Sequence, residues 1–308
     1  MQQIRPLEKA YPAYSNILNF YGTGAATPTA RMNALRSLPA ADLLKGHTES
    51  HAFGGVGLTI EEGPNAIWNE ATIDVLQRGG CDEWVKEVII GTNEDEGSMF
   101  SMMMQPLLKP EGFNAYISKF PTATREAYAA AYPPSFFDTL SPTDYLNAPA
   151  SKVIADQLFV MPARRLAEAM VKPNATTGEQ PKVYLYRCRE MIDRLITPEL
   201  NLGSMHSIDI PLIFNVVPLW EEGSREAATA QAMGSRWAHF AATGNPRQSF
   251  VLHPSSSLSS RSLAVLSPSL ADDDNDRADP EWKEYSSANP SWLAFNGGGK
   301  TKMEQLSV

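Results

Sequence analysis

The stretch that decides the fold is VIIGTNEDEG, Val88–Gly97. Its first residues are the end of a short apolar run, Trp84–Gly91, whose β-branched residues predict a buried strand. Three acids, Glu94, Asp95 and Glu96, follow this strand without a break. Such a cluster is usually a solvated turn, but the acid of a catalytic triad can also lie just beyond a sheet strand. A catalytic role for one of these acids requires a partner side chain elsewhere in the sequence.

A second strand is predicted at Lys182–Arg189, where aromatic and aliphatic side chains alternate between the two faces. Helical spacing dominates elsewhere. Ser151–Val171 is rich in Ala and Leu and is interrupted by Pro162, and Glu226–Thr243 carries an apolar stripe that ends before a Gly-Asn-Pro sequence. Ser37 is expected to begin a further helix. The sequence between the two predicted strands is thus mostly helix-like.

His206 is the candidate partner for the acids. It lies in GSMHSIDIPLIF, after the second strand, so a predicted strand precedes both the acids and this histidine. An acid followed later in the chain by a histidine is the order of the last two members of a Ser–acid–His triad in some α/β enzymes. A lone histidine before an apolar segment is more often structural, so the two sites together carry more weight than either alone.

Charge and composition narrow the function classes. The chain has 26 Lys+Arg against 35 Asp+Glu, a net charge of -9, which argues against a nucleic-acid or anionic-membrane surface. No apolar run approaches the roughly 18 residues of a membrane-spanning helix. The first residues, MQQIRPLEKAY, lack the apolar stretch of a signal peptide. Cys81 and Cys188 exclude a disulfide framework and a four-cysteine zinc site, and whether they form one bridge stays open.

Three short motifs have ordinary explanations that we favour. Gly297–Thr301 resembles the end of a P-loop, but Ala294 stands where that pattern needs glycine, so a Gly-rich turn is expected. His47 and His51 occur as HTESH rather than HExxH, which favours loop histidines over a metal site. Asn174 begins a glycosylation sequon that matters only in a secretory context. We expect no metal and no cofactor.

A series of stretches, in order, resembles one known family. The chain is similar to the C-terminal portion of a type-B carboxylesterase, the cholinesterase-like branch of the α/β-hydrolase fold. GTNEDEG and WAHFAATGNP are the most specific parts of the resemblance. The matching stretches are ALRSLPAADLL, VIIGTNEDEGSMF, DQLFVMPARRLA, VYLYR, GSMHSIDIPLIF, MGSRWAHFAATGNP and PSWLAFNGGGKTKME.

The resemblance assigns roles residue by residue. The family's acidic triad member falls on Glu96 and its general-base histidine on His206, so the two side chains are expected about 2.6–3.2 Å apart. Glu94 and Asp95 then become turn residues. One departure is Ser207, because the family commonly has glycine after this histidine.

The family's nucleophile is not found. No two of the 20 glycines are four positions apart, so a G-x-S-x-G elbow occurs nowhere in the sequence. In the family, that elbow and the oxyanion loop lie upstream of the matched region. The resemblance therefore implies a partial α/β-hydrolase: later sheet strands, the helical cap region and C-terminal helices, without the N-terminal strands and the elbow. It implies a single domain over 1–308 with a low-complexity insertion at 247–278.

Two functions fit this pattern. The first is an ester hydrolase by descent that lacks its nucleophilic serine and is inactive as this chain. The second is a non-catalytic, cholinesterase-like binding or interaction protein. The first is favoured because the acid and the histidine are kept while a whole block is missing. Its partners would be a small ester substrate, if a missing half completes the site, and a protein that supplies that half. Substrate identity and compartment stay open: cytoplasmic is the default, although full-length relatives are often secreted.

Overall fold

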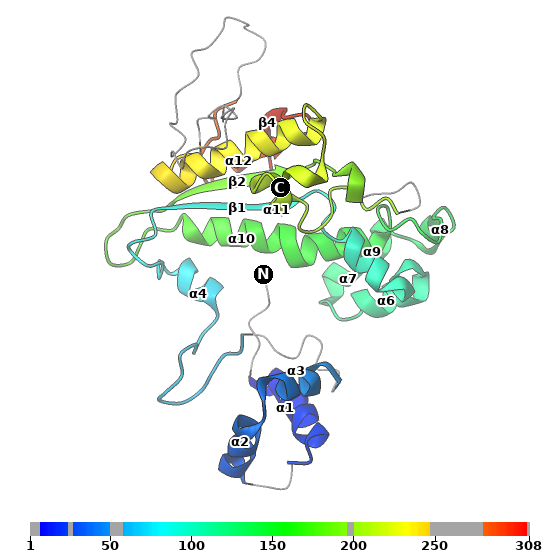
Figure 1. Ribbon diagram of the computed structural model, residues 1–308, viewed down its shortest axis with the longest axis vertical. Helices are drawn as coiled ribbons and strands as arrows, with labels where there is room; N and C mark the ends of the chain where they lie inside the picture. Colours follow the sequence, from blue (N-terminus) through cyan, green and yellow to red (C-terminus); the bar gives the residue numbers. More distant parts are fainter. Residues whose placement is uncertain (1–6, 24–26, 50–57, 196–199, 247–279, 307–308) are drawn as a thin grey trace, which may run out of the picture. The chain divides into compact units, whose positions relative to one another are not determined.

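The computed structural model describes residues 7–23, 27–49, 58–195, 200–246 and 280–306. The expected insertion at 247–278 and the histidine at position 51 lie outside these residues. The chain divides into two compact units, 1–76 and 77–308 (Figure 1). Each unit is described by itself, and the single-domain organisation over 1–308 stays a prediction.

The first unit is helical. Its elements include α1 (Leu7–Phe20), α2 (Pro28–Ser37) and α3 (Ala40–Glu49), and α4 (Thr72–Gln77) lies at the boundary between the units. The prediction that Ser37 begins a helix is wrong. Ser37 is the last residue of α2, where its hydroxyl donates to the carbonyl of Ala34 at 2.7 Å. The helix that follows begins only after Pro39, which is suited to a helix start because it lacks an amide hydrogen.

The second unit is built on a four-stranded mixed sheet. Its strands are β1 (Glu87–Asn93), β2 (Lys182–Cys188), β3 (Ser291–Phe295) and β4 (Thr301–Gln305), in the spatial order β1-β2-β3-β4. The first three run parallel, and β4 is antiparallel to β3. Parallel neighbours need long crossover connections, and here those connections carry the helices. The α/β class is confirmed, and both predicted strands are present. The first spans Glu87–Asn93 rather than Trp84–Gly91, and its residues from Glu87 to Gly91 are only partly buried.

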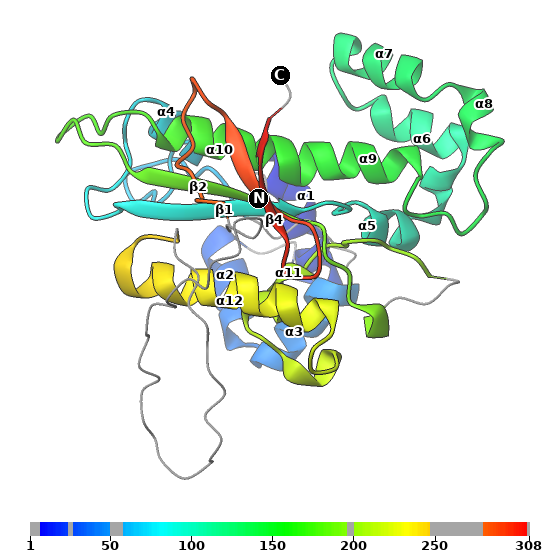
Figure 2. The same ribbon diagram turned by 90° about the horizontal axis from the view of Figure 1, so that it is seen from above.

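Helices cover both faces of this sheet (Figure 2). On one side lie α9 (Pro149–Ala155) and α10 (Met161–Met170), joined by a π-helical turn at Asp156–Val160. The expected interruption at Pro162 takes this form: proline cannot donate to the carbonyl four residues back, and a wider turn precedes it. On the other side lies α12 (Arg225–Thr243), which ends at Gly244 with φ 73 as predicted.

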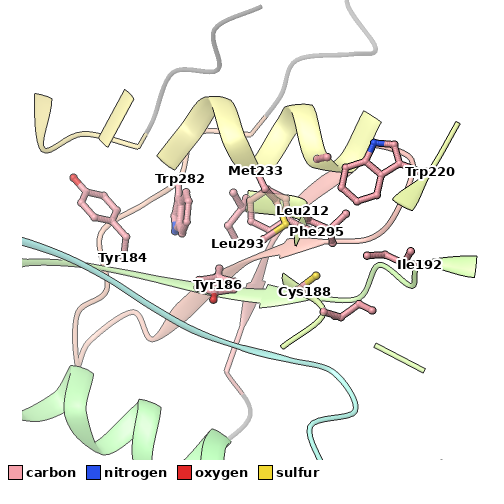
Figure 3. Close-up of a cluster of buried hydrophobic side chains, with 12 residues drawn as sticks. Tyr184, Tyr186, Cys188, Ile192, Leu212, Trp220, Met233, Trp282, Leu293 and Phe295 are labelled. Atoms are coloured by element: carbon pink, nitrogen blue, oxygen red, sulfur yellow. The ribbon is translucent and has the colours of Figure 1, made fainter. Parts of the chain in front are cut away.

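The core of the second unit lies between the sheet and α12 (Figure 3). Aromatic side chains dominate it: Tyr184 and Tyr186 from β2 make edge-on contacts with Trp282. Trp282 is fully buried, and its Nε1 donates to the carbonyl of Leu185 at 2.9 Å. A buried indole with a satisfied N–H combines large apolar burial with a fixed orientation. The cluster consists of Tyr184, Tyr186, Cys188, Ile192, Ile208, Leu212, Trp220, Ala230, Met233, Trp282, Leu293 and Phe295.

Further short helices complete this unit. They are α5 (Ser98–Met103), α6 (Pro110–Ile117), α7 (Thr122–Ala131), α8 (Pro134–Phe137) and α11 (Asp209–Ile213), with 3-10 turns at Gln105–Leu108, Asp193–Leu195 and Val217–Leu219. A second cluster, around Phe113, Ile117 and Ile154, packs α6 against α9. Within the described ranges no helix is long and apolar enough to cross a bilayer.

The glycine run 297–299 forms the β3–β4 hairpin turn, as expected. All three glycines have positive φ, between 61° and 80°, a region that side chains disfavour. The turn is held by the buried Glu190 and by Thr229 of α12. Gly298 N donates to Glu190 Oε2 at 3.0 Å, and Gly299 N donates to Thr229 Oγ1 at 3.1 Å.

Candidate active site

Two loops meet at the carboxyl ends of β1 and β2. We call residues 94–97 the acid loop, because it follows β1, and residues 202–207 the histidine loop. The two loops form a parallel bridge between Asp95 and Met205. Ser98 also joins them, since its hydroxyl lies 2.8 Å from the carbonyl of Asp95 and 2.6 Å from that of Leu202. The sequence places an acid and a histidine more than a hundred residues apart, and the sheet brings them together.

Glu96 and His206 are in direct contact. His206 Nδ1 lies 2.7 Å from Glu96 Oε2, within the distance expected from the sequence. The other carboxylate oxygen, Oε1, accepts from the backbone N–H of Asn93 at 2.8 Å. The Glu96 side chain is 5% exposed and that of His206 is 34% exposed. The acid is therefore buried and held at both oxygens, while the imidazole reaches the surface of the loop pair.

The contact defines which nitrogen of His206 carries the proton. A carboxylate can only accept, so Nδ1 is the donor, and in the neutral ring Nε2 then keeps its lone pair. No described residue forms a hydrogen bond with Nε2. Phe100 and Phe159 flank the ring, with centroids 5.3 and 4.8 Å away. An oriented imidazole with an open Nε2 has the geometry of a general base.

Backbone conformation explains two positions beside the pair. Gly97 is the N-cap of α5, and a Cβ there would lie 1.9 Å from the carbonyl oxygen of Ser151, so only glycine fits. Ser207, which stands where the resembling family commonly has glycine, adopts φ 70. The left-handed conformation is thus retained although the residue that prefers it is absent.

Asp209 fastens the segment after the histidine, which the sequence analysis did not anticipate. Its Oδ1 accepts from Asn93 Nδ2 at 3.1 Å, and its Oδ2 accepts from the hydroxyl of Tyr186 at 2.6 Å. Burial, and then the charge of Asp209, raise the pKa of Tyr186 far above its ordinary value, so the phenol stays a donor. The available signal was an acid three residues after His206, but its partners on β1 and β2 are distant in sequence.

The other two acids of the acid loop both form ion pairs with basic side chains. Glu94 accepts from Arg187 Nε at 2.7 Å and from Arg189 Nε at 3.0 Å. Burial alone would raise the pKa of Glu94, but the two guanidinium groups outweigh it and hold that pKa below its usual range. Asp95 contacts Ser204 and Lys152. Glu94 and Asp95 lie in the short connection after β1, and β2, α9 and the histidine loop supply partners that no local pattern reveals.

The remaining sequence candidates have no place in this site. His51 lies outside the described residues, and within the described ranges no three metal-ligating side chains gather. Asn174 is buried: its Nδ2 donates to the carbonyl of Cys81 at 2.5 Å and its Oδ1 caps the turn that follows, so the sequon amide is already committed. Cys81 and Cys188 are free thiols. Burial raises the pKa of Cys188 to about 12, which leaves it a poor nucleophile.

A buried carboxylate that orients an imidazole, at the carboxyl ends of parallel strands between two helical layers, defines an α/β protein with an acid–histidine pair. Residues 8–307 match the family model described as Carboxylesterase family. The chain therefore belongs to the carboxylesterase family, and ester hydrolysis is the activity that family resemblance supports. The match spans nearly the whole chain, so it does not confirm that the fold is partial.

Proposed function

We propose that this chain carries the acid and the general base of an ester hydrolase. His206 Nε2 takes the proton of a serine hydroxyl as its oxygen attacks the ester carbonyl, and the imidazolium then gives that proton to the departing alcohol. Glu96 holds the ring and stabilises the imidazolium while it exists. Water, deprotonated by the same nitrogen, releases the acid and restores the serine.

One observation supports this proposal above the others. The 2.7 Å contact uses the buried Oε2 of Glu96 and the Nδ1 of His206, and it leaves Nε2 without a described partner. A histidine kept for packing alone has no need of a buried carboxylate whose second oxygen is itself fixed by the Asn93 amide. Burying such a carboxylate is costly unless it is paired.

The nucleophile is the second part of the proposal. Since no G-x-S-x-G elbow occurs in the sequence, the serine and the oxyanion donors come from outside these 308 residues. The four strands then correspond to the later strands of an α/β-hydrolase sheet, and this chain alone does not hydrolyse esters. A non-catalytic binding protein is the alternative, and the intact pair speaks against it.

The test of inactivity uses the purified chain and short-chain p-nitrophenyl esters. We expect wild-type protein and His206→Ala to release p-nitrophenol at the same rate, because an acyl-enzyme cannot form. A serine-directed organophosphate should label neither protein. Turnover above that of His206→Ala, abolished by the organophosphate, would show that a serine within this chain has taken the role.

The test of the pair needs a nucleophile. Co-expression with the N-terminal segment of an active carboxylesterase, which carries its serine elbow, should give turnover. His206→Ala should lower that turnover by roughly 10²–10⁴-fold, and Glu96→Gln should lower it as well, since the amide favours the wrong tautomer. Glu94→Gln is the matched control from the same loop. Turnover that is unchanged in His206→Ala would exclude the proposed roles and favour a binding protein.

A further inference from the structure

The histidine loop is attached to the acid loop mainly through one residue, Asp95. Its backbone N–H donates to the carbonyl of Ser204 at 2.9 Å, and its Oδ2 accepts from the backbone N–H of Ser204 at 3.1 Å. Ser204 is thus held at both of its backbone polar groups by a single residue, two positions before His206. Hydrogen bonds to a charged acceptor are stronger than neutral ones, so the carboxylate contact is the firmer of the two.

The second oxygen of Asp95 is tied to a different element. Oδ1 lies 3.3 Å from Nζ of Lys152 in α9. The Asp95 side chain is 14% exposed and that of Lys152 is 43% exposed, so this ion pair is partly screened by water. The ion pair mainly fixes the orientation of the Asp95 carboxylate: because Oδ1 is directed towards α9, Oδ2 faces the histidine loop.

The histidine loop is shaped around this carboxylate. Gly203 has φ 64, and a Cβ at this position would lie 2.2 Å from Asp95 Oδ2 and 2.7 Å from Leu146 Cδ1. A larger residue would have to displace the carboxylate or the loop. The other attachments of the loop, from Ser98 to the carbonyl of Leu202 and from the Ser204 hydroxyl to the carbonyl of Cys188, do not contact Asp95 Oδ2.

We propose that Asp95 is a positioning residue for His206, and this rests on the general-base role proposed above. Asp95 and Glu96 are consecutive, so one carboxylate fixes the backbone of the histidine loop while the next fixes the ring. One residue of slip along an extended segment moves a side chain by about 3.3 Å. Such a slip would separate atoms that now lie 2.7 Å apart. Asp95 sets the register in which Nδ1 reaches Glu96.

The experiment follows the ring rather than turnover, so it does not depend on a nucleophile. The full chain, labelled with ¹⁵N-histidine, is examined for the low-field proton resonance of an Nδ1–H bound to a carboxylate. Glu96→Gln identifies that resonance by abolishing it. Asp95→Ala should abolish it too, whereas Asp95→Asn, which keeps an oxygen for the Ser204 amide, should retain it. Glu94→Gln, the matched control, should also retain it.

A second variant and a second measurement keep the test valid if Asp95→Ala fails to fold. Gly203→Ala leaves Asp95 in place but crowds its carboxylate, and it should also abolish the resonance. Carbethoxylation of His206, followed by peptide mass spectrometry at micromolar protein, should be faster in both Asp95→Ala and Gly203→Ala than in Glu94→Gln. Thermal unfolding is recorded in parallel for every variant.

The outcomes separate the two proposals. An unchanged resonance and carbethoxylation rate in a folded Asp95→Ala overturns the positioning role. Global unfolding of both Asp95→Ala and Gly203→Ala also overturns it, since Asp95 would then act in folding. If wild-type protein shows no low-field resonance that Glu96→Gln removes, the Glu96–His206 pair itself fails, and with it the proposed function.

Discussion

At the scale of single residues, the site depends on a few backbone positions as much as on the pair itself. Gly97 and Gly203 have no room for a Cβ, because the carbonyl of Ser151 and the carboxylate of Asp95 occupy that space. Ser207 differs from these two, since it carries a side chain in a left-handed conformation that favours glycine. The chain tolerates this strain directly beside His206.

Replacing Ser207 by glycine should therefore stabilise the protein. The left-handed conformation costs an ordinary L-residue about 1–2 kcal/mol, and the extra freedom of glycine in the unfolded chain offsets part of the gain. We expect a net increase in the free energy of unfolding of up to about 1 kcal/mol in urea titrations. Ser118→Gly, at φ -60, is the control and should destabilise. A Ser207→Gly protein less stable than wild type would contradict this account.

At the scale of elements, buried charge connects the β3–β4 hairpin to α12. Glu190 is fully buried; its Oε1 accepts from Arg225 Nη1 at 2.7 Å, and its Oε2 accepts from the Thr229 hydroxyl at 2.6 Å and from Gly298 N at 3.0 Å. Arg189 makes a second connection, because it reaches Glu94 beyond β1 and Glu304 on β4. Glu190 thus connects the end of β2 to the hairpin turn and α12, and Arg189 connects it to the acid loop and β4.

Removing the Glu190 carboxylate should be costly. Glu190→Ala removes the shared partner of Arg225, Thr229 and Gly298 and frees the hairpin turn. Because Arg225 is 37% exposed and keeps Asp193 and Glu226 nearby, we expect a loss of about 3 kcal/mol, in the range of hydrogen bonds to a charged group. Thr229→Ala removes the hydrogen bonds of the Thr229 hydroxyl to Glu190 and to Gly299 N, and should cost about 1–2 kcal/mol. Chemical denaturation of both variants measures the difference. Equal losses in the two would mean that the carboxylate adds nothing beyond its contact with Thr229.

The Arg189 connection should make stability depend on pH. The hydrogen bond from Arg189 holds the pKa of Glu304 below its usual range, so the stabilisation is present above the unfolded pKa and lost as pH falls through the folded one. Glu304→Gln should cost up to about 1 kcal/mol at pH 7, as partly exposed pairs do. That difference should shrink between about pH 5 and pH 3. A difference that stays constant down to pH 3 would argue against the ion pair.

At the scale of the whole molecule, β1 is one of the two edge strands of the described sheet, and β4 is the other. In the ranges that the structure describes, β1 pairs only with β2, and its residues from Glu87 to Gly91 are only partly buried, although the sequence predicts a buried strand. In the ladder with β2, the even-numbered residues of β1 make the hydrogen bonds. Those at its two ends show this, because the carbonyl of Lys86 accepts from Lys182 N and the N–H of Glu94 donates to the carbonyl of Cys188. Glu87, Ile89 and Gly91 therefore direct their N–H and C=O groups away from the sheet.

An open apolar edge predicts self-association of the purified chain. We expect oligomers that grow with protein concentration in size-exclusion chromatography with light scattering. Glu87→Pro removes one outward N–H at the first residue of the strand, where proline is tolerated, and should reduce association more than Glu87→Ala. A monodisperse monomer with one cooperative unfolding transition would show that the chain forms a complete core by itself. That result would favour the alternative of a non-catalytic binding protein.

Local patterns predicted part of this molecule and could not predict the rest. The strands at Ile89–Ile90 and Tyr184–Tyr186 and the helix ending at Gly244 follow from periodicity and capping within a few residues. The contact between Glu96 and His206 was expected from family resemblance, not from spacing. The partners of Glu94, Asp95 and Asp209 were missed, because each contact joins positions between 23 and 116 residues apart. Only the sheet topology brings such residues together.

The glycine turn at 297–299 has one further consequence. Its sequence suggested a phosphate loop, and one of its amides does bind an anion, but that anion is the carboxylate of Glu190, supplied by the protein itself. The Arg225 guanidinium neutralises the same group from the other side. The backbone amide of the turn that could bind an external anion is thus already bonded to a carboxylate of the same chain. A free phosphate would have to compete with a tethered carboxylate that is always present at the turn, so this glycine-rich segment is closed to nucleotides by self-occupancy.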